Sequence, residues 1–266
     1  MNLRPAIALI TISLLAPSIA RTHAGQAVAK SDKPILVELF TSEGCSSCPP
    51  ADALLAHIDA RQPVNGAEAI ILEEHVDYWD GQGWPDPFAS KEATQRQESY
   101  AKILHAEVYT PQMIVDGRVE ILGSDDRAAQ RAIQIATGAP KTDLDLSWVG
   151  ATATMGGPKL LRVRLKKLSD ASASDGQNAE VFLAVTESHL HSDVRRGENA
   201  GKGLEHDGVV RKLTSLGRAS GSGEYSFDLQ TGVKLSPDWK RENIRVIVFV
   251  QDTRSRRIYA AASTTY

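Results

Sequence analysis

The feature that most constrains this chain is its pair of cysteines, Cys45 and Cys48, the only two in 266 residues. They follow an apolar, β-type run over residues 35–40 and precede a helical pattern over residues 51–59. A Cys-x-x-Cys between a strand and a helix is typical of thiol–disulfide redox sites. Unpaired N–H groups and the helix dipole stabilise a thiolate there, and the thiolate attacks disulfides. We therefore predict that Cys45 attacks and that Cys48, one turn into the helix, resolves the mixed disulfide.

Two other interpretations of the cysteine pair stay open. A structural zinc site needs four ligands, and the sequence holds no second cysteine pair, so we predict no metal at this position. A static Cys45–Cys48 disulfide is the stronger alternative. Its loop is very short, however, and in the loop-entropy model such a loop constrains the unfolded chain little. The motif context favours redox exchange.

Composition places the chain among ordinary globular proteins. Hydrophobic residues make up 42% and charged residues 24%, and the length allows two modest domains. The protein has a formal net charge of -3, whereas nucleic-acid-binding proteins usually carry a basic surface. We therefore expect no nucleic-acid partner. No feature of the sequence calls for an organic cofactor.

Residues 1–24 have the pattern of a secretory signal peptide. Arg4 supplies positive charge, residues 6–16 are apolar, and small residues allow cleavage after Ala20 or Ala24. The apolar run is too short for a membrane span, although an uncleaved anchor is the alternative. Export implies an oxidising compartment, so we expect a periplasmic or secreted protein without a membrane segment after cleavage.

The pattern of residues 31–140 predicts an α/β domain. Pro111 cannot donate to a ladder and belongs at a strand start, and Asp116-Gly117 is a strong hairpin turn. Strands are expected at 33–40, 69–76 and 118–122 besides the one that Pro111 begins, and helices at 51–59, 90–104 and 125–137.

A loop rich in glycine, proline and aromatic residues follows the strand at 69–76. Loops after strand ends are where α/β sheets place their sites. Its aromatic side chains are candidates for a substrate-binding wall beside the dithiol that accepts a peptide or small thiol: Tyr78, Trp79, Trp84 and Phe88. The alternative, and the commoner fate of aromatic residues, is that they pack the loop onto the domain.

Glu38 interrupts the first apolar strand. A buried acid near the dithiol would move protons during thiol exchange. The alternative is that Glu38 points to solvent at a sheet margin, because lone carboxylates are seldom buried without a partner. Both readings stay open from the residues alone.

The order of elements, the Cys-x-x-Cys at the first helix and the Thr110-Pro111 before the hairpin resemble the thioredoxin fold. The resemblance implies a cis Pro111 against the dithiol and a Thr110 backbone that pairs with substrate. It also maps the buried acid of that superfamily to Glu38, with one inserted residue. The chain departs from thioredoxins at Gly44, where they carry an aromatic residue, and at Ser46-Ser47, where they carry Gly-Pro.

The closer resemblance is to a secreted bacterial thioredoxin-like family catalogued as domain of unknown function 1223. Residues 38–52, 75–80 and 109–113 match its pattern, and so does the Arg-Arg-Gly-Glu-Asn-Ala-Gly run at 195–201. The resemblance implies a fold but no established substrate. We assign Gln112, within the third motif, to the substrate site.

Residues 141–266 change to short strands separated by turn signals. Strands are expected at 143–149, 160–166, 180–187, 224–229, 244–251 and 257–262. Short strands at this spacing predict an all-β antiparallel sandwich as the second domain.

The segment 188–211 is dense in charged residues and histidines. One interpretation is an anion or partner site at Arg195-Arg196. Another is a metal site from His189, His191 and His206, since residues two apart on a strand share a face. The third is a charged surface loop with incidental histidines, and it is favoured because such clusters are usually solvated.

We hypothesise an exported thiol–disulfide oxidoreductase that acts on a protein or small-molecule thiol or disulfide through Cys45, Cys48, Thr110, Pro111 and Glu38. The alternative is a non-enzymatic binding module for a peptide, a thiol or copper, with an inert disulfide. Soft thiolates with Met113 and His75 nearby would suit Cu(I). The sequence indicates neither the redox direction nor the oligomeric state.

Overall fold

The computed structural model describes residue 1 and residues 32–150, 157–168, 178–219 and 224–266. The predicted signal peptide and its cleavage sites lie outside these residues, apart from Met1. Residues 31–266 form one compact unit. No helix in the described ranges is long and apolar enough to cross a membrane.

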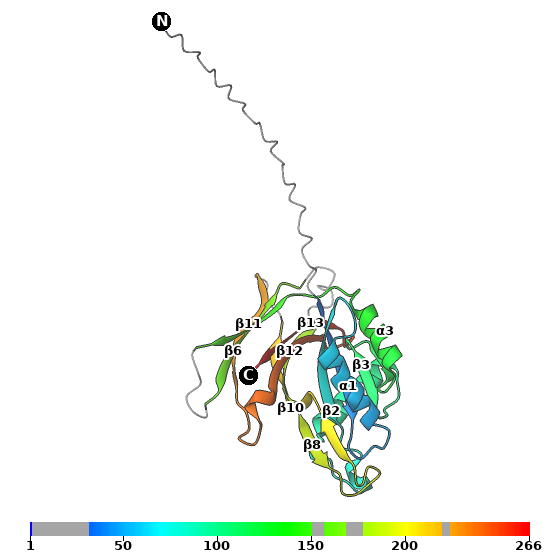
Figure 1. The fold of residues 1–266 in the computed structure, drawn as a ribbon. Helices are drawn as coiled ribbons and strands as arrows, with labels where there is room; N and C mark the ends of the chain where they lie inside the picture. Colours follow the sequence, from blue (N-terminus) through cyan, green and yellow to red (C-terminus); the bar gives the residue numbers. More distant parts are fainter. Residues whose placement is uncertain (2–31, 151–156, 169–177, 220–223) are drawn as a thin grey trace. The chain divides into compact units, whose positions relative to one another are not determined.

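A large mixed sheet runs through both halves of the chain (Figure 1). Within the described residues it has eight strands, in the order β13 (Ile258–Thr265), β12 (Ile244–Asp252), β7 (Ala179–Glu187), β10 (Val209–Arg218), β2 (Ala67–His75), β1 (Lys33–Thr41), β3 (Gln112–Val115) and β4 (Val119–Leu122). β2 pairs in parallel with β1 and, through Val209 opposite Glu73, with β10. Four of these strands lie after residue 140, so the sheet continues across the expected domain boundary.

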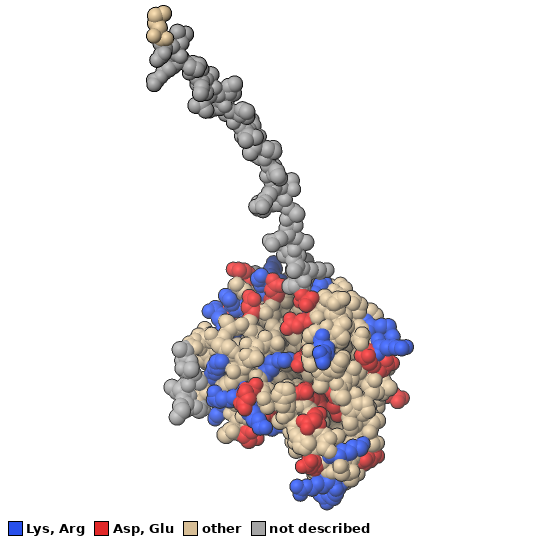
Figure 2. Space-filling view, viewed as in Figure 1, with Lys and Arg blue, Asp and Glu red and all other residues tan. Residues whose placement is uncertain are grey.

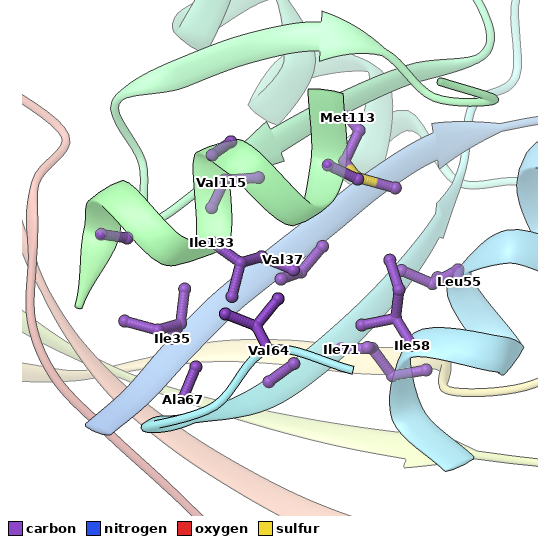
Figure 3. Packing of buried hydrophobic residues seen from close by; sticks show 14 of the residues in the cluster. Ile35, Val37, Leu55, Ile58, Val64, Ala67, Ile71, Met113, Val115 and Ile133 are labelled. Carbon is purple, nitrogen blue, oxygen red and sulfur yellow. The ribbon is translucent and has the colours of Figure 1, made fainter. Parts of the chain in front are cut away.

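Helices cover both faces of the first-half strands. α1 (Pro49–Arg61) and α3 (Asp126–Ala136) lie on one face, where Leu55 and Ile133 pack with Val37 (Figure 3). α2 (Lys91–Leu104) lies on the other face, where Tyr100 meets Phe40 edge to face. Complete burial of such a side chain contributes about 1.5–3 kcal/mol. Strand β1 is apolar on both faces because it is covered on both.

Local sequence signals account for the ends of these elements. Proline opens α1, where its missing N–H costs little, and Ser90 and Asp125 cap α2 and α3 by accepting backbone N–H bonds. The predicted turn at Asp116-Gly117 joins β3 to β4, with φ of 54° and 69°. A Cβ on Gly117 would lie 1.9 Å from a backbone oxygen of Arg256, so only glycine fits.

The second half forms two packed layers. A separate antiparallel sheet contains β11 (Tyr225–Val233), β6 (Lys159–Lys166) and β5 (Leu144–Val149) in its described part. Its Leu161 and Val163 lie in one apolar cluster with Val181 and Val248 of the large sheet. The second layer of the expected sandwich is therefore continuous with the first-half sheet, because β10 pairs with the edge of β2.

Three strands arise where no strand was expected. β8 (Leu190–Asp193) and β9 (Gly203–His206) form a hairpin within the charged segment, and β10 follows it. Acidic and basic side chains are interspersed over the face drawn in Figure 2. The loop between β8 and β9 carries the residues of the second half that contact the cysteine loop.

Candidate functional site

Cys45 and Cys48 form a disulfide at the start of α1, with their Cα atoms 5.5 Å apart and Cys48 at the N-cap position. The exposed fractions of the two residues are only 1% and 0%, whereas Ser46 and Ser47 between them are exposed. The loop thus presents its serines to solvent and keeps both sulfur atoms beneath the surface.

The Thr110-Pro111 segment faces the disulfide. The peptide bond between these residues is cis, as the resemblance implied. Cys45 Sγ lies 3.8 Å from the Thr110 carbonyl oxygen, and Trp79 Nε1 donates a hydrogen bond to Thr110 Oγ1 at 2.9 Å. The structure therefore brings together Cys45, Thr110 and Trp79 of the predicted site.

The absence of an aromatic residue before Cys45 has a steric cause. A Cβ atom on Gly44 would lie 3.0 Å from Trp79 Cβ and 3.5 Å from Ser42 Oγ. The approach of Trp79 thus leaves little room for a side chain at position 44. The indole fills space beside the dithiol from a different part of the chain.

Two further aromatic residues of the predicted substrate wall, Trp84 and Tyr78, each donate a side-chain hydrogen bond. Trp84 Nε1 donates to Glu43 Oε2 at 2.7 Å, two residues before Cys45. Tyr78 has an exposed fraction of 39% and its hydroxyl donates to Gln97 Oε1 at 3.2 Å. Both remain candidates for contact with a substrate.

Phe88 and Gln112 fit the predicted substrate site less well than Trp84 and Tyr78 do. Phe88 makes edge contacts with the rings of His75 and His206. Gln112 is 1% exposed, pairs with β1 through its backbone and donates from Nε2 to the Glu107 carbonyl at 2.9 Å. The assignment of Gln112 to the substrate site is corrected, because its buried side chain makes hydrogen bonds within the protein.

A loop from the second half, residues 194–202, is bonded to the backbone of the Cys-x-x-Cys segment. Asn199 is fully buried, and its Nδ2 donates to the carbonyl oxygens of Glu43 at 2.8 Å and Cys45 at 2.9 Å. Glu198 Oε2 accepts a bond from the Ser46 N–H at 3.1 Å. Sequence reasoning marked this motif but assigned no role to Asn199. Its buried amide satisfies two carbonyls of the Cys-x-x-Cys loop.

Glu38 is buried but lies away from α1. Its Oε1 accepts from Arg96 Nε at 2.6 Å, and the Tyr100 hydroxyl donates to its Oε2. Arg96 Nε also lies 3.2 Å from Glu74 Oε1. Because side chains alternate along a strand and Leu39 packs toward α1, Glu38 faces α2. The predicted role of Glu38 as the acid beneath the dithiol is corrected on this ground.

Asp52 is a second buried acid, and it lies on α1 itself, four residues after Cys48. It is buried one helical turn after Cys48, and its Oδ1 accepts from Thr41 Oγ1 at 2.6 Å. Burial, with the nearby charge of Glu73, raises the pKa of Asp52 to about 7. Sequence reasoning missed this residue, although an acid on the apolar face of an expected helix is a signal that could have found it.

A chain of buried acids and imidazoles continues from this point. His75 Nδ1 lies 2.7 Å from Asp86 Oδ2, and His75 Nε2 lies 3.3 Å from Glu73 Oε1. The same Glu73 oxygen lies 2.7 Å from His206 Nδ1, and His206 Nε2 lies 3.3 Å from Glu43 Oε1. The chain therefore ends two residues from Cys45.

Electrostatics within this chain favour charged groups despite burial. Burial alone would lower the pKa of His75, but the charge and hydrogen bond of Asp86 raise it well above its usual value. Burial also opposes charge on His206, but the carboxylates of Glu43 and Glu73 beside its ring raise its pKa to about 9. Burial would raise the pKa of Glu73, yet the two imidazoles beside its carboxylate lower it.

The histidine cluster considered for the charged segment is not formed. In the β8–β9 hairpin Leu190 pairs with His206 and His191 pairs with Glu205, so His191 and His206 point to opposite faces. His189 and His191 are exposed beside Asp207 and Glu205, respectively. Only His206 enters the interior.

The copper arrangement considered from the sequence lacks its two thiolates in the oxidised protein, because Cys45 and Cys48 are joined in a disulfide. Met113 is buried in the cluster between the sheet and the helices α1 and α3, and His75 belongs to the acid–imidazole chain.

A protein-family model described as "Protein of unknown function (DUF1223)" matches residues 36–251. An X-ray crystal structure of a protein from Agrobacterium tumefaciens is similar, with a TM-score of 0.64 and 25% sequence identity. The similarity covers 88% of this chain and 95% of that one. No curated protein matches the chain.

Proposed function

The chain belongs to the DUF1223 family, and we propose that it is a thiol–disulfide oxidoreductase with a thioredoxin-like first half. One observation carries the proposal. The Cys45–Cys48 disulfide lies at the N-terminus of a helix, and Cys45 Sγ faces the Thr110 carbonyl at 3.8 Å. A disulfide at a helix N-terminus favours the thiolate of its first cysteine when reduced.

The reaction exchanges one disulfide for another. In the reduced protein the Cys45 thiolate attacks a substrate disulfide, forms a mixed disulfide and releases one substrate thiolate. Cys48 then loses its proton and attacks Cys45 Sγ, which closes the protein disulfide and releases the second substrate thiolate. Both released thiolates are protonated, so two electrons pass to the substrate; the reverse sequence oxidises a dithiol.

Asp52 is the group that we assign to proton transfer in the second step. A general base works best when its pKa lies near the working pH, and the pKa of about 7 meets that condition. Asp52 follows Cys48 by one helical turn, and its backbone N–H bonds to the Cys48 carbonyl at 3.1 Å. It takes over the role that the sequence suggested for Glu38.

We infer that the loop of residues 194–202 limits access to the sulfur atoms. Cys45 is 1% exposed, and Asn199 and Glu198 hold the loop against it. A substrate disulfide therefore reaches Cys45 after this loop has moved. Trp79, Trp84 and Tyr78 border the same region and supply apolar contact for a peptide or small thiol.

The same burial favours a second candidate. A disulfide that is 1% and 0% exposed at its two residues is also what a non-enzymatic binding module with a structural disulfide would contain. The two candidates differ in whether the couple exchanges with its surroundings.

Intermediate trapping tests the proposed function. Cys48→Ser leaves the attacking thiol without its resolving partner, so it should accumulate mixed disulfides with thiol reagents and proteins. Cys45→Ser should accumulate few. Equal trapping by both variants contradicts the assigned roles, and no trapping by either favours the structural disulfide.

The proposal extends to the cellular location of the protein and to its substrates. The pattern of residues 1–24 supports export to the periplasm or beyond, where a dithiol enzyme meets disulfide substrates. The chemistry requires only a thiol or disulfide partner and uses no cofactor beyond the two cysteines.

A further inference from the structure

We propose that Glu73, His75 and His206 bind a divalent transition-metal ion, for which Zn²⁺ is the expected occupant. One potential ligand atom from each side chain lies within 4.8 Å of the others, and all three residues are buried. The proposal does not depend on the redox chemistry of the dithiol, because it uses neither cysteine.

The atoms that face one another define the donor set. Glu73 Oε1 lies 3.3 Å from His75 Nε2 and 2.7 Å from His206 Nδ1. At zinc–ligand bond lengths near 2.0–2.1 Å, neighbouring ligand atoms of a tetrahedral ion lie about 3.3 Å apart. The first pair has this spacing, and the second needs to open by roughly 0.6 Å.

Outer carboxylates hold both imidazoles as metal sites require. His75 Nδ1 lies 2.7 Å from Asp86 Oδ2, and His206 Nε2 lies 3.3 Å from Glu43 Oε1. A metal-binding histidine almost always gives its second ring nitrogen to a carboxylate, carbonyl or water, which fixes its tautomer. Each histidine here has one nitrogen toward Glu73 and the other toward an outer acid.

Unsatisfied polar atoms point to a missing ligand. His75 Nε2 and His206 Nε2, with Glu43 Oε1, make no hydrogen bond with any described residue although they are buried. An unpaired buried polar atom is costly, and most such atoms have partners in native proteins. A metal ion on His75 Nε2 satisfies that nitrogen, and it orients the His206 ring so that its Nε2–H donates to Glu43.

The donor set favours zinc over harder ions. Imidazole nitrogens suit Zn²⁺, Cu²⁺ and Ni²⁺, whereas Mg²⁺ and Ca²⁺ prefer oxygen ligands. Two histidines and one glutamate are a known zinc donor set that leaves a fourth position for water or an added ligand. A cavity of about 390 Å³ lined in part by His75, Phe88 and Arg211 lies beside one of the three proposed ligands, His75.

Zinc titration tests the proposal. The mature full-length protein, with its disulfide oxidised so that no thiolate competes, is stripped with a chelator and titrated with ZnCl₂ in a calorimeter. The expected result is one Zn²⁺ per chain. His75→Gln and His206→Gln each remove a ligand and should weaken binding by more than about 100-fold.

Matched variants separate ligation from folding. His191→Gln alters an exposed histidine on the same hairpin and should bind zinc as the wild type does. Asp86→Asn keeps all three ligands but weakens the outer support of His75, so zinc binding should fall by roughly 10–100-fold. This variant tests the site without removing a ligand, and it therefore serves if His75→Gln and His206→Gln do not fold. Absence of zinc binding in the oxidised wild type overturns the proposal. Equal weakening by His191→Gln and His206→Gln, or unchanged binding in both ligand variants, overturns it as well.

Discussion

Asn199 donates a hydrogen bond from its side-chain amide to the carbonyl oxygen of Cys45, at 2.9 Å and across 154 positions of sequence. A second bond from the same nitrogen reaches the Glu43 carbonyl at 2.8 Å. A residue of the second half thus supports the backbone of the cysteine loop. The first half does not form the site alone.

Replacement of Asn199 should therefore loosen the dithiol. Asn199→Ala removes both bonds. The Cys45 carbonyl keeps its bond from the Cys48 N–H, whereas the Glu43 carbonyl loses its amide donor, which should lower the free energy of unfolding by about 1–3 kcal/mol. It should also speed reduction of the disulfide by dithiothreitol, because the cysteine loop loses its support from the second half. Urea unfolding and the rate of thiol release measure the two effects.

Lys202→Ala is the matched control for this variant. Lys202 Nζ donates to Asn199 Oδ1 at 2.8 Å, so its removal spares both bonds to the cysteine loop. Its reduction rate should stay near that of the wild type. A reduction rate that is unchanged in Asn199→Ala would show that the loop does not limit access.

Asp52 should give the resolving step its pH dependence. In the wild type the step that releases the second thiolate from an aromatic disulfide reagent should accelerate as pH rises through about 7, where Asp52 loses its proton. Asp52→Asn should slow this step by roughly 10²-fold and shift its rise toward the pKa of the free thiol. Stopped-flow absorbance from pH 5 to pH 9 records both profiles.

The same variant has a stability signature of defined sign. The pKa of Asp52 is about 7 in the folded state against a model value of 3.8, so the folded protein retains a proton that the unfolded chain loses. The wild type should thus lose stability relative to Asp52→Asn as pH rises from about 4 to 7. Asp59→Asn, on the same helix but partly exposed at its ion pair with Arg245, should show neither effect.

Arg96 should be a major determinant of stability. It is buried between Glu38 and Glu74, and its replacement by methionine leaves two buried acids without their partner. Breaking such a cluster costs about 3–5 kcal/mol. Arg245→Met, at an ion pair whose arginine side chain is 37% exposed, should cost at most about 1 kcal/mol by urea unfolding. Equal costs would contradict the role of burial.

Local patterns predicted the elements well where hydrophobic period and turn chemistry agreed. The strand before the cysteines, the helix after them and the Asp116-Gly117 turn all appear in the structure. The continuation of the sheet into the second half could not be read from the sequence. It depends on which edge of β2 remains free, and Val209 joins that edge across a long separation.

The site shows the same division between local and distant contacts. The Cys-x-x-Cys at the helix start followed from the local pattern, and the facing Thr110 followed from the resemblance to the thioredoxin fold. Asn199 and His206, by contrast, reach the site from the charged segment. Sequence charge suggested a solvated loop there, because burial of polar residues depends on partners elsewhere in the chain. Glu38 was misassigned for a related reason: the sequence did not show which face of β1 the helix α1 covers.

The reduction potential of the Cys45–Cys48 couple tests the proposed function most directly. The protein with its Cys45–Cys48 disulfide would be equilibrated in buffers with different ratios of reduced to oxidised glutathione. Its free thiols would then be alkylated and counted by mass measurement. The proposal predicts a potential between about -120 and -230 mV, the range of exchanging catalysts. A potential below roughly -300 mV, typical of structural disulfides, would contradict it and favour the non-enzymatic binding module.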